Sequence, residues 1–196
     1  MSSFLDAYKK TLAHEGRYSL DPDDRGGETF KGVSRRTHPD WPGWEIIDKA
    51  KKGVNFQSAL AQDEELERHV QALYYHRYWS PVGGDNLDYP LIAEELFDTA
   101  VNTGVSFASK SFQRGLNALN RNEGLFQDIQ VDGVVGDQTL LAYNIISREL
   151  KDLEALYTLL NLIQGNMYLD ICERNHAMEK YLRGWLNRVT ITKDPF

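Results

Sequence analysis

The first part of the chain holds a glutamate and a group of carboxylates whose types and spacing suit the hydrolysis of a glycosidic bond. Glu15 is followed by Asp21, Asp23, Asp24 and Glu28 within a short polar stretch. Glycoside hydrolysis needs one carboxylic acid to protonate the leaving oxygen and a second carboxylate to act as base or nucleophile. Glu15 is the candidate acid. Spacing favours Asp24 as its partner, and the three other carboxylates remain alternatives.

Glu15 is expected at the end of the first helix. Ser3 can cap a helix in which Phe4, Tyr8 and Leu12 recur four residues apart, and a glycine follows Glu15. Partial burial beside apolar residues and the negative end of the helix dipole would both raise the pKa of Glu15 and keep it protonated. Taken without any motif, a solvated acid at the end of a helix is the simpler interpretation.

The hydrophobic pattern of the whole chain predicts a mainly α protein. After the first helix, residues 17–33 are rich in Gly, Asp and Pro, which predicts a loop or a short irregular β-hairpin. Further helices are expected over residues 44–52, 57–79, 91–103, 106–120, 137–150, 153–173 and 176–189. A polar loop is expected over residues 121–136. Gly115 falls inside one of these helices, where a glycine weakens the prediction of a continuous helix.

The composition is that of a globular protein and argues against several classes of partner. The formal net charge is −7, which disfavours nucleic-acid binding because phosphate contacts need a basic face. No apolar run is long enough to span a bilayer, so membrane insertion is not expected. Cys172 is the only cysteine. An intramolecular disulfide is therefore excluded, and the apolar neighbours of Cys172 indicate a buried structural thiol.

No metal site and no cofactor are predicted. His14 and Glu15 begin like a zinc-protease motif, but Tyr18 stands where the second histidine is required. The aspartate-rich stretch matches a calcium loop only in part, because Arg25 occupies a ligand position and Gly32 replaces the bidentate glutamate. The glycine pairs show no phosphate-loop pattern.

A series of motifs, running in order along most of the chain, carries a family resemblance. A glutamate at a helix end, followed by an aspartate and a threonine at this spacing, looks like the catalytic arrangement of phage-type lysozymes. The motifs are Glu15–Tyr18, Asp21–Asp24, Gly26–Thr29, Gly32–Ser34, Phe97–Gly104, Phe112–Asn117, Val131–Gly136 and Gly184–Val189. Together they resemble glycoside hydrolase family 108, whose members are N-acetylmuramidases, some once named secretion activators.

The resemblance implies a lysozyme-like helical fold and roles for three residues. Glu15 is the general acid, Asp24 stabilises the reacting centre or activates water, and Thr29 positions the attacking water through its hydroxyl. For Thr29 the alternative is a turn residue that bonds to its own backbone. Arg17 and Arg25 depart from the family pattern, where Gly and Pro are common. Arg17 could narrow the cleft or pair with a loop aspartate.

The resemblance also implies a division of the chain. Residues 1–90 are expected to form the lysozyme-like catalytic region, and residues 91–196 a helical peptidoglycan-binding region. The two are expected to pack as one compact unit. The turn-rich segment 81–90, which begins and ends with proline, is the best candidate for the boundary, and a helix that straddles the two halves is the alternative.

Five further residues are candidates for substrate binding. Asp98 and Asn102 lie four apart on one helix face, where they could bond to sugar hydroxyls or acetamides. The alternative is a structural pair that joins two helices. Tyr18, Trp185 and Arg188 could stack on sugars or bind carboxylates, and the alternative for each is a place in the core.

The predicted function is hydrolysis of the β-1,4 bond between N-acetylmuramic acid and N-acetylglucosamine, as in a lysozyme-type endolysin. Peptidoglycan is the expected partner. A lytic transglycosylase using Glu15 alone and a non-catalytic peptidoglycan-binding or secretion-associated module are the alternatives. Residues 1–10 lack the apolar stretch of a secretory signal. The protein is therefore expected to be made in the cytoplasm and released to the wall by a holin or another export route.

Overall fold

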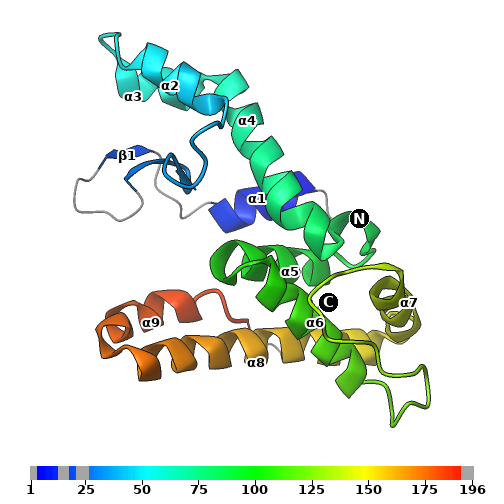
Figure 1. The fold of residues 1–196 in the computed structure, drawn as a ribbon. Coiled ribbons are helices and arrows are strands. Elements are labelled where there is room, and N and C mark those ends of the chain that lie inside the picture. The colour runs from blue at the N-terminus through cyan, green and yellow to red at the C-terminus, as the bar shows by residue number, and fades with distance from the viewer. Residues whose placement is uncertain (1–3, 13–17, 21–26, 191–196) are drawn as a thin grey trace. The chain divides into compact units, whose positions relative to one another are not determined.

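The computed structural model describes residues 4–12, 18–20 and 27–190, and in these residues helices predominate over one small sheet (Figure 1). The expected mainly α fold is confirmed. The chain forms two compact units. One comprises Leu5–His76, and the other comprises Phe4 and the residues from Arg77 onward.

The first unit combines helices with a three-stranded antiparallel sheet. Its helices are α1 (Phe4–Leu12, which begins in the other unit), α2 (Gly43–Ala50), α3 (Phe56–Gln62) and α4 (Glu64–Tyr74). Its strands are β1 (Tyr18–Leu20), β2 (Glu28–Phe30) and β3 (Val33–Ser34), in the order β1-β2-β3. The predicted short hairpin is therefore confirmed. It forms part of a three-stranded sheet in which β2 is the central strand.

The prediction of a single helix over residues 57–79 was wrong, because the structure has α3, α4 and a π-helical turn over this range. The helix is interrupted at Asp63, whose backbone is extended at φ −80° and ψ 103°. The Asp63 carboxylate accepts a 2.8 Å hydrogen bond from the backbone N–H of Leu66 and so starts α4 as a new helix. The segment Tyr75–Trp79 then forms a π-helical turn rather than a continuation of α4.

Two tryptophans organise the core of the first unit. The Trp41 ring stacks on Phe30 of β2 at 6.5 Å and meets Trp44 edge-on at 5.0 Å. Trp41 also lies directly over Gly43, where a Cβ would come within 2.2 Å of the ring. Only glycine permits this approach. Ile47 of α2 is fully buried with them, so the sheet and α2 share one apolar centre.

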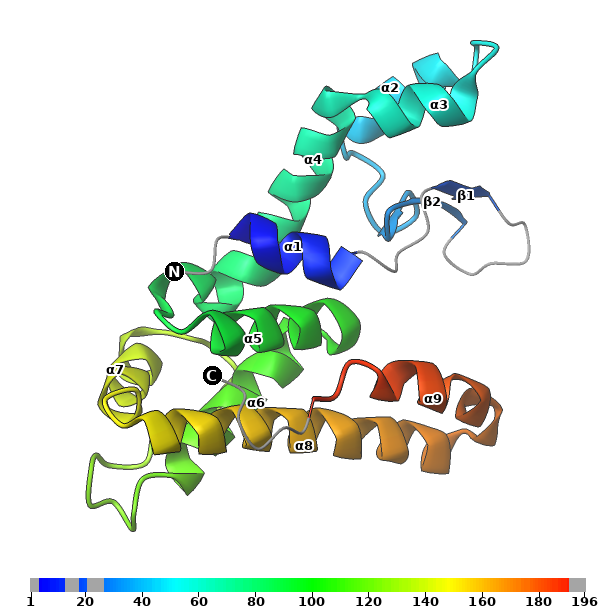
Figure 2. The same ribbon diagram turned by 180° about the vertical axis from the view of Figure 1, so that it is seen from behind.

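The second unit is built around one long helix. Its helices are α5 (Pro90–Thr103), α6 (Val105–Ala118), α7 (Asp137–Ile146), α8 (Leu150–Arg174) and α9 (Glu179–Leu186). Helices α5 and α6 both pack on α8, and α9 runs back along α8 (Figures 1 and 2). The helix predicted over 176–189 is shorter than expected, because a 3-10 turn at His176–Met178 precedes α9.

Helix α6 passes through Gly115 without interruption. A Cβ at this position would come within 2.8 Å of the Leu156 side chain in α8. The glycine therefore allows close packing of α6 on α8, which offsets its low helix propensity. Phe112 and Leu116, on either side in sequence, are fully buried.

The structure also bears on the predicted burial of Cys172 and on membrane insertion. Cys172 is buried in α8, as predicted. In the described part of the chain, no helix combines the length and apolar character needed to cross a membrane.

Candidate active site and family

The two carboxylates proposed for catalysis, Glu15 and Asp24, lie outside the described residues. The same holds for Asp21 and Asp23, so the roles of all four stay predictions. Helix α1 is described as far as Leu12, and residues 13–17, with Glu15 among them, lie outside the described residues.

Thr29 lies in the middle of the central strand. Its Cα pairs with that of Ser19 in β1 and with that of Ser34 in β3. Thr29 is therefore a strand residue and not a turn residue. Its side chain is half-buried, so its position is set by the sheet while part of the residue still reaches solvent.

Glu28, one of the alternatives for the second carboxylate, is held by two cations. The carboxylate is 10% exposed and pairs with Arg35 at 3.0 Å and with Lys51 at 2.7 Å. The Tyr18 hydroxyl also donates to it at 3.2 Å. These three partners occupy the carboxylate oxygens that a water molecule would have to reach. We infer that Glu28 fixes the hairpin, which leaves the three aspartates as candidate bases.

Tyr18 is anchored from both ends of its side chain. Its ring meets Phe56 of α3 edge-on at 4.8 Å, and Lys51 lies 6.0 Å from the ring centre. Burial, aided by the charge of Glu28, raises the pKa of the Tyr18 hydroxyl. The hydroxyl therefore remains a hydrogen-bond donor at neutral pH.

A network that the sequence did not reveal joins α1 to the turn after β2. The Tyr8 hydroxyl of α1 donates to Oε1 of Glu67 in α4 at 3.0 Å. Lys31 Nζ donates to the other carboxylate oxygen, Oε2. The Tyr74 hydroxyl of α4 donates to the Lys31 carbonyl at 2.9 Å, and the Tyr8 and Tyr74 rings meet edge-on. We call these four residues the Glu67 network.

The contacts of the Glu67 network lower the pKa of Glu67. Burial alone would raise this pKa, but the hydrogen bond and charge of Lys31, with the hydrogen bonds from Tyr8 and Gln71, hold it below its ordinary value. The network spans the helix that leads to Glu15 and the turn that follows Thr29. Its hydrogen bonds join residues as far as 59 positions apart in sequence, so no local pattern could have indicated it.

The structure brings three predicted binding residues together in the second unit. Asp98 of α5 pairs with Arg188 at 2.8 Å and accepts a 3.1 Å bond from the Asn102 side chain. Gln164 of α8 also donates to Asp98, at 3.4 Å. Asp98 thus joins α5, α8 and the segment after α9. Asn102 itself is exposed.

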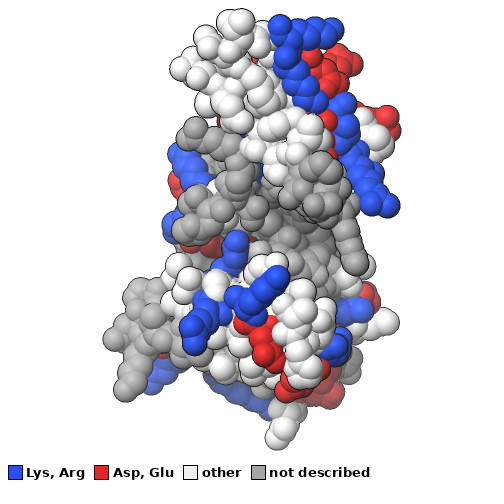
Figure 3. Space-filling view, turned by 90° about the vertical axis from the view of Figure 1, so that its left-hand side faces the viewer, with Lys and Arg blue, Asp and Glu red and all other residues white. Residues whose placement is uncertain are grey.

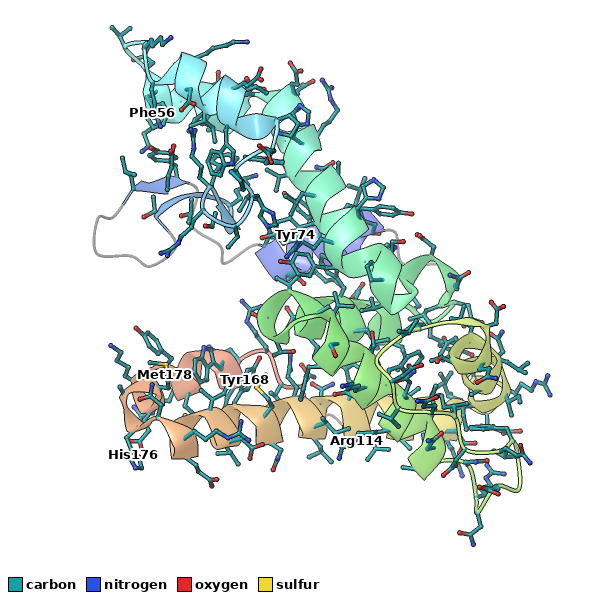
Figure 4. The ribbon with its side chains drawn as sticks, in the orientation of Figure 1. Phe56, Tyr74, Arg114, Tyr168, His176 and Met178 are labelled. Carbon is teal, nitrogen blue, oxygen red and sulfur yellow. The ribbon has the colours of Figure 1, made fainter. Side chains whose placement is uncertain are left out.

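Trp185, the remaining predicted binding residue, belongs to an aromatic row. Its ring lies 5.4 Å from Tyr168 of α8 and stacks on Tyr181 at 6.0 Å. Tyr168 lies on the side of α8 that faces α9 (Figure 4). Tyr168 is buried, Trp185 is half-buried and Tyr181 is exposed. The row therefore reaches the surface at α9.

Two family profiles match the chain, one after the other. The first, glycosyl hydrolase 108, matches residues 8–104, and the second, a predicted peptidoglycan domain, matches residues 107–190. The chain belongs to glycosyl hydrolase family 108. With both domains present, it is a glycoside hydrolase that acts on peptidoglycan.

A solved structure has a similar fold. The structure of Brucella abortus SagA superposes with a TM-score of 0.60 at 23% sequence identity, and the match covers 95% of this chain and 88% of that chain. At this identity the likeness shows the fold. No curated protein gives a significant match.

In the peptidoglycan domain of this family 108 chain, the predicted loop before α7 is held by one buried side chain. Gln113 of α6 donates to Asp132 at 2.8 Å and to the Val134 carbonyl at 3.0 Å, and it accepts from the backbone N–H of Gly133 at 2.8 Å. Gly133 has φ +85°, which favours glycine. The Asp132-Gly133 motif thus owes its shape to Gln113.

The family 108 domain also contains a buried carboxyl that sequence reasoning missed. Glu95 of α5 is 7% exposed. Burial, with a further contribution from the charge of Asp98, raises the pKa of Glu95 to about 8. The Thr99 hydroxyl lies 3.3 Å from the Glu95 carboxyl and also accepts a bond from Gln164. The place of Glu95 within a strongly apolar predicted helix was the feature of the sequence that could have indicated a buried carboxyl.

Charge is mixed on the surface of this family 108 chain. Basic and acidic side chains are interspersed on the face drawn in Figure 3. A surface of this kind suits a target recognised by stacking and hydrogen bonds more than by long-range attraction.

Proposed function

We propose that the chain hydrolyses the β-1,4 bond between N-acetylmuramic acid and N-acetylglucosamine, with Glu15 as general acid. One observation carries the proposal. The family 108 match includes Glu15, and α1 leads towards it while the hairpin that follows places Thr29 on its central strand. The Glu67 network joins α1 to the turn that follows Thr29.

The reaction assigns one task to each proposed catalytic residue. Glu15 gives its proton to the glycosidic oxygen as the bond to the anomeric carbon breaks. Asp24 acts on the opposite side of the sugar, where it activates the water or stabilises the positive charge. The Thr29 hydroxyl orients the attacking water. Glu28 keeps the hairpin in place through its two ion pairs.

We further propose that each region binds glycan through residues of its own. Tyr18 offers its ring and hydroxyl beside the hairpin, and Trp185 offers a stacking surface on α9. Asn102 is exposed and can bond to sugar groups. The Asn102 side chain donates a hydrogen bond to Asp98, which is itself held by an ion pair with Arg188. Catalysis is assigned to residues 1–90 and peptidoglycan binding to residues 91–196.

The experiment that tests the bond specificity is product analysis. Purified peptidoglycan is digested with the protein, and the soluble fragments are examined by mass spectrometry. The proposal expects fragments that carry N-acetylmuramic acid at a reducing end. Reducing N-acetylglucosamine ends would contradict the specificity, and anhydro ends would replace hydrolysis by a transglycosylase reaction.

A further inference from the structure

The long helix α8 carries a second row of mostly apolar side chains, on the side that faces away from the core. Its buried residues face the rest of the unit, and in Figures 1 and 2 both α5 and α9 lie on the same side of α8. Six other residues recur at alternating spacings of four and three, which places them along one helix face. They are Ala155, Leu159, Leu162, Asn166, Leu169 and Glu173. We call this row the outer seam.

The outer seam is accessible along its whole length. None of its six residues is buried, and Leu162 and Leu169 are 48% and 50% exposed. Since each residue of a helix adds about 1.5 Å, the seam runs for roughly 27 Å along α8. Extended apolar surface of this kind marks an interaction site more often than a face that stays in water.

The spacing of the outer seam is that of helices that pair through a heptad repeat. In such helices the residues of the seam recur at alternating intervals of three and four, and the seams of two helices pack against each other. Asn166 stands between Leu162 and Leu169 in the seam. A single asparagine in an apolar seam is typical of paired helices, where it selects the register. The pattern therefore favours a second helix as the partner.

The outer seam is complementary to itself when two copies run antiparallel. Ala155 precedes Leu162 by seven residues, and Leu169 follows it by seven. About a two-fold axis at Leu162, the small Ala155 of one copy therefore faces the large Leu169 of the other. Lys151 and Glu173, both exposed, lie eleven residues before and after Leu162. Opposite charges then face each other at both ends of the seam.

We propose that the outer seam of α8 binds the outer seam of a second copy of this chain, in an antiparallel dimer. A parallel pair is disfavoured, because it brings Lys151 against Lys151 and Glu173 against Glu173. The dimer carries two peptidoglycan domains. Two domains on one particle raise the apparent affinity for an insoluble wall without any new contact to it.

Sedimentation equilibrium of the full chain, over a series of protein concentrations, tests the dimer. The unmodified protein should show a monomer–dimer equilibrium. Leu162→Asp places two like charges at the axis and should raise the dissociation constant of the dimer by at least roughly tenfold. Leu141→Asp changes a leucine of α7 that is 62% exposed and lies outside the seam, and it should match the unmodified protein. A monomer at every concentration, or equal dissociation constants for the two variants, would overturn the proposal.

An exchange of charges tests the antiparallel direction. Glu173→Lys should weaken the dimer several-fold, because it places a lysine opposite Lys151 of the other copy. Adding Lys151→Glu to the same chain exchanges the two charges and should restore the dissociation constant of the unmodified protein. A double variant that stays as weak as Glu173→Lys would overturn the antiparallel pairing.

Disulfide cross-linking gives an independent measure of the same geometry. Cys172 is buried, so Leu162→Cys adds an exposed thiol at the proposed axis. With diamide as the oxidant, this variant should form a covalent dimer. In Leu169→Cys the two thiols lie roughly 21 Å apart along the helices, beyond the reach of a disulfide, and no covalent dimer should form. Equal cross-linking of the two variants would contradict the antiparallel dimer.

Lipid is the other occupant that these variants can detect. Sedimentation with vesicles of phosphatidylethanolamine and phosphatidylglycerol is measured for the unmodified protein and for Leu162→Asp. The proposal expects no binding by either protein. A monomeric protein that binds these vesicles, and loses the binding in Leu162→Asp, would assign the outer seam to a lipid surface and overturn the dimer.

Discussion

Lys31 Nζ and Glu67 Oε2 form an ion pair that joins the turn after β2 to α4. Tyr8 adds α1 to the same carboxylate through its hydroxyl. Helix α1 leads to the proposed acid Glu15, and the turn follows Thr29. Through Glu67, the turn that follows Thr29 and helix α1 are therefore joined to the same position of α4.

Replacing Glu67 by Ala should lower both activity and stability. The change removes the hydrogen bonds from Tyr8 and Gln71 and leaves Lys31 without its carboxylate. We expect a loss of about 1–3 kcal/mol in the free energy of unfolding. The kcat for peptidoglycan should fall several-fold, because the elements that Glu67 joins are displaced.

The control for Glu67 is Glu65→Gln on the same helix, whose carboxylate is largely exposed. It should behave like the unmodified protein in urea denaturation and in release of reducing ends. Equal kcat values for Glu67→Ala and Glu65→Gln would show that the Glu67 network does not position the reacting groups.

The pKa of Glu67 also predicts a pH dependence of stability. This pKa lies below its ordinary value of 4.5 in the folded protein. The contribution of Glu67 is therefore complete above about pH 4.5 and is lost as the pH falls through the lower folded value. Urea denaturation of Glu67→Gln should show a weaker loss of stability below pH 4.5 than the unmodified protein. Parallel pH curves for the two proteins would contradict the shift.

Glu95 should have the opposite effect on stability. Its pKa is about 8 in the folded protein against 4.5 as the ordinary value. Between these values the unfolded chain releases a proton that the folded protein keeps, so stability falls as the pH rises from 4.5 to 8. Glu95→Gln removes this titration. The free energy of unfolding of the variant should therefore rise relative to the unmodified protein over that range, by a few kcal/mol at most.

Glu94→Gln, one position earlier on α5, is the comparison for Glu95. Because Glu94 is half-buried, its substitution tests whether any carboxylate on this helix gives the same pH dependence. An identical change of the pH dependence in Glu94→Gln would show that the effect is not particular to Glu95. If the difference in the free energy of unfolding between Glu95→Gln and the unmodified protein stayed constant from pH 4.5 to 8, the raised pKa of Glu95 would be refuted.

Thr29→Val tests the hydroxyl on the central strand. Valine keeps the β-branched shape that suits a strand, so the sheet should persist. Loss of the hydroxyl should lower kcat by at least about tenfold, as expected when a group that orients the nucleophile is removed. Thr29→Ser, which retains the hydroxyl, should recover most of the rate. Full activity of Thr29→Val in a reducing-end assay would remove Thr29 from the mechanism.

Trp185→Ala tests the aromatic row on α9. The substitution leaves Tyr181 and Tyr168 without the ring between them. Sedimentation with insoluble peptidoglycan should show weaker binding by several-fold, whereas Trp185→Phe should bind nearly as well as the unmodified protein. Identical binding of the alanine variant would assign Trp185 to packing alone.

The local features of the fold were predictable, and the long-range contacts were not. Periodicity indicated helices such as α5, α6 and α8, and the glycine-rich stretch indicated the hairpin, because these signals lie within short windows. The break at Asp63 was missed because a capping aspartate inside an apolar pattern also fits a continuous helix. Gly115 was weighed on propensity alone, whereas the contact with Leu156 explains it.

The candidate site shows the same division. Thr29 and Tyr18 were nominated by motif, and the structure places them on adjacent strands of one sheet. Glu67 and Lys31 carried no motif, because their significance depends on contacts across 36 residues of sequence. Asp98 and Asn102 were paired correctly by helical spacing, but Arg188, 90 residues away, could be joined to them only by the fold.

The central claim is that Glu15 protonates the leaving oxygen, and one substitution tests it most directly. Glu15→Gln keeps the size and polarity of the side chain and removes the acid. Release of reducing ends from purified peptidoglycan is measured for the variant and the unmodified protein, with thermal unfolding as the check on folding. We predict an unchanged Tm and a loss of activity of at least about a hundredfold. A correctly folded Glu15→Gln protein with full activity would contradict the account.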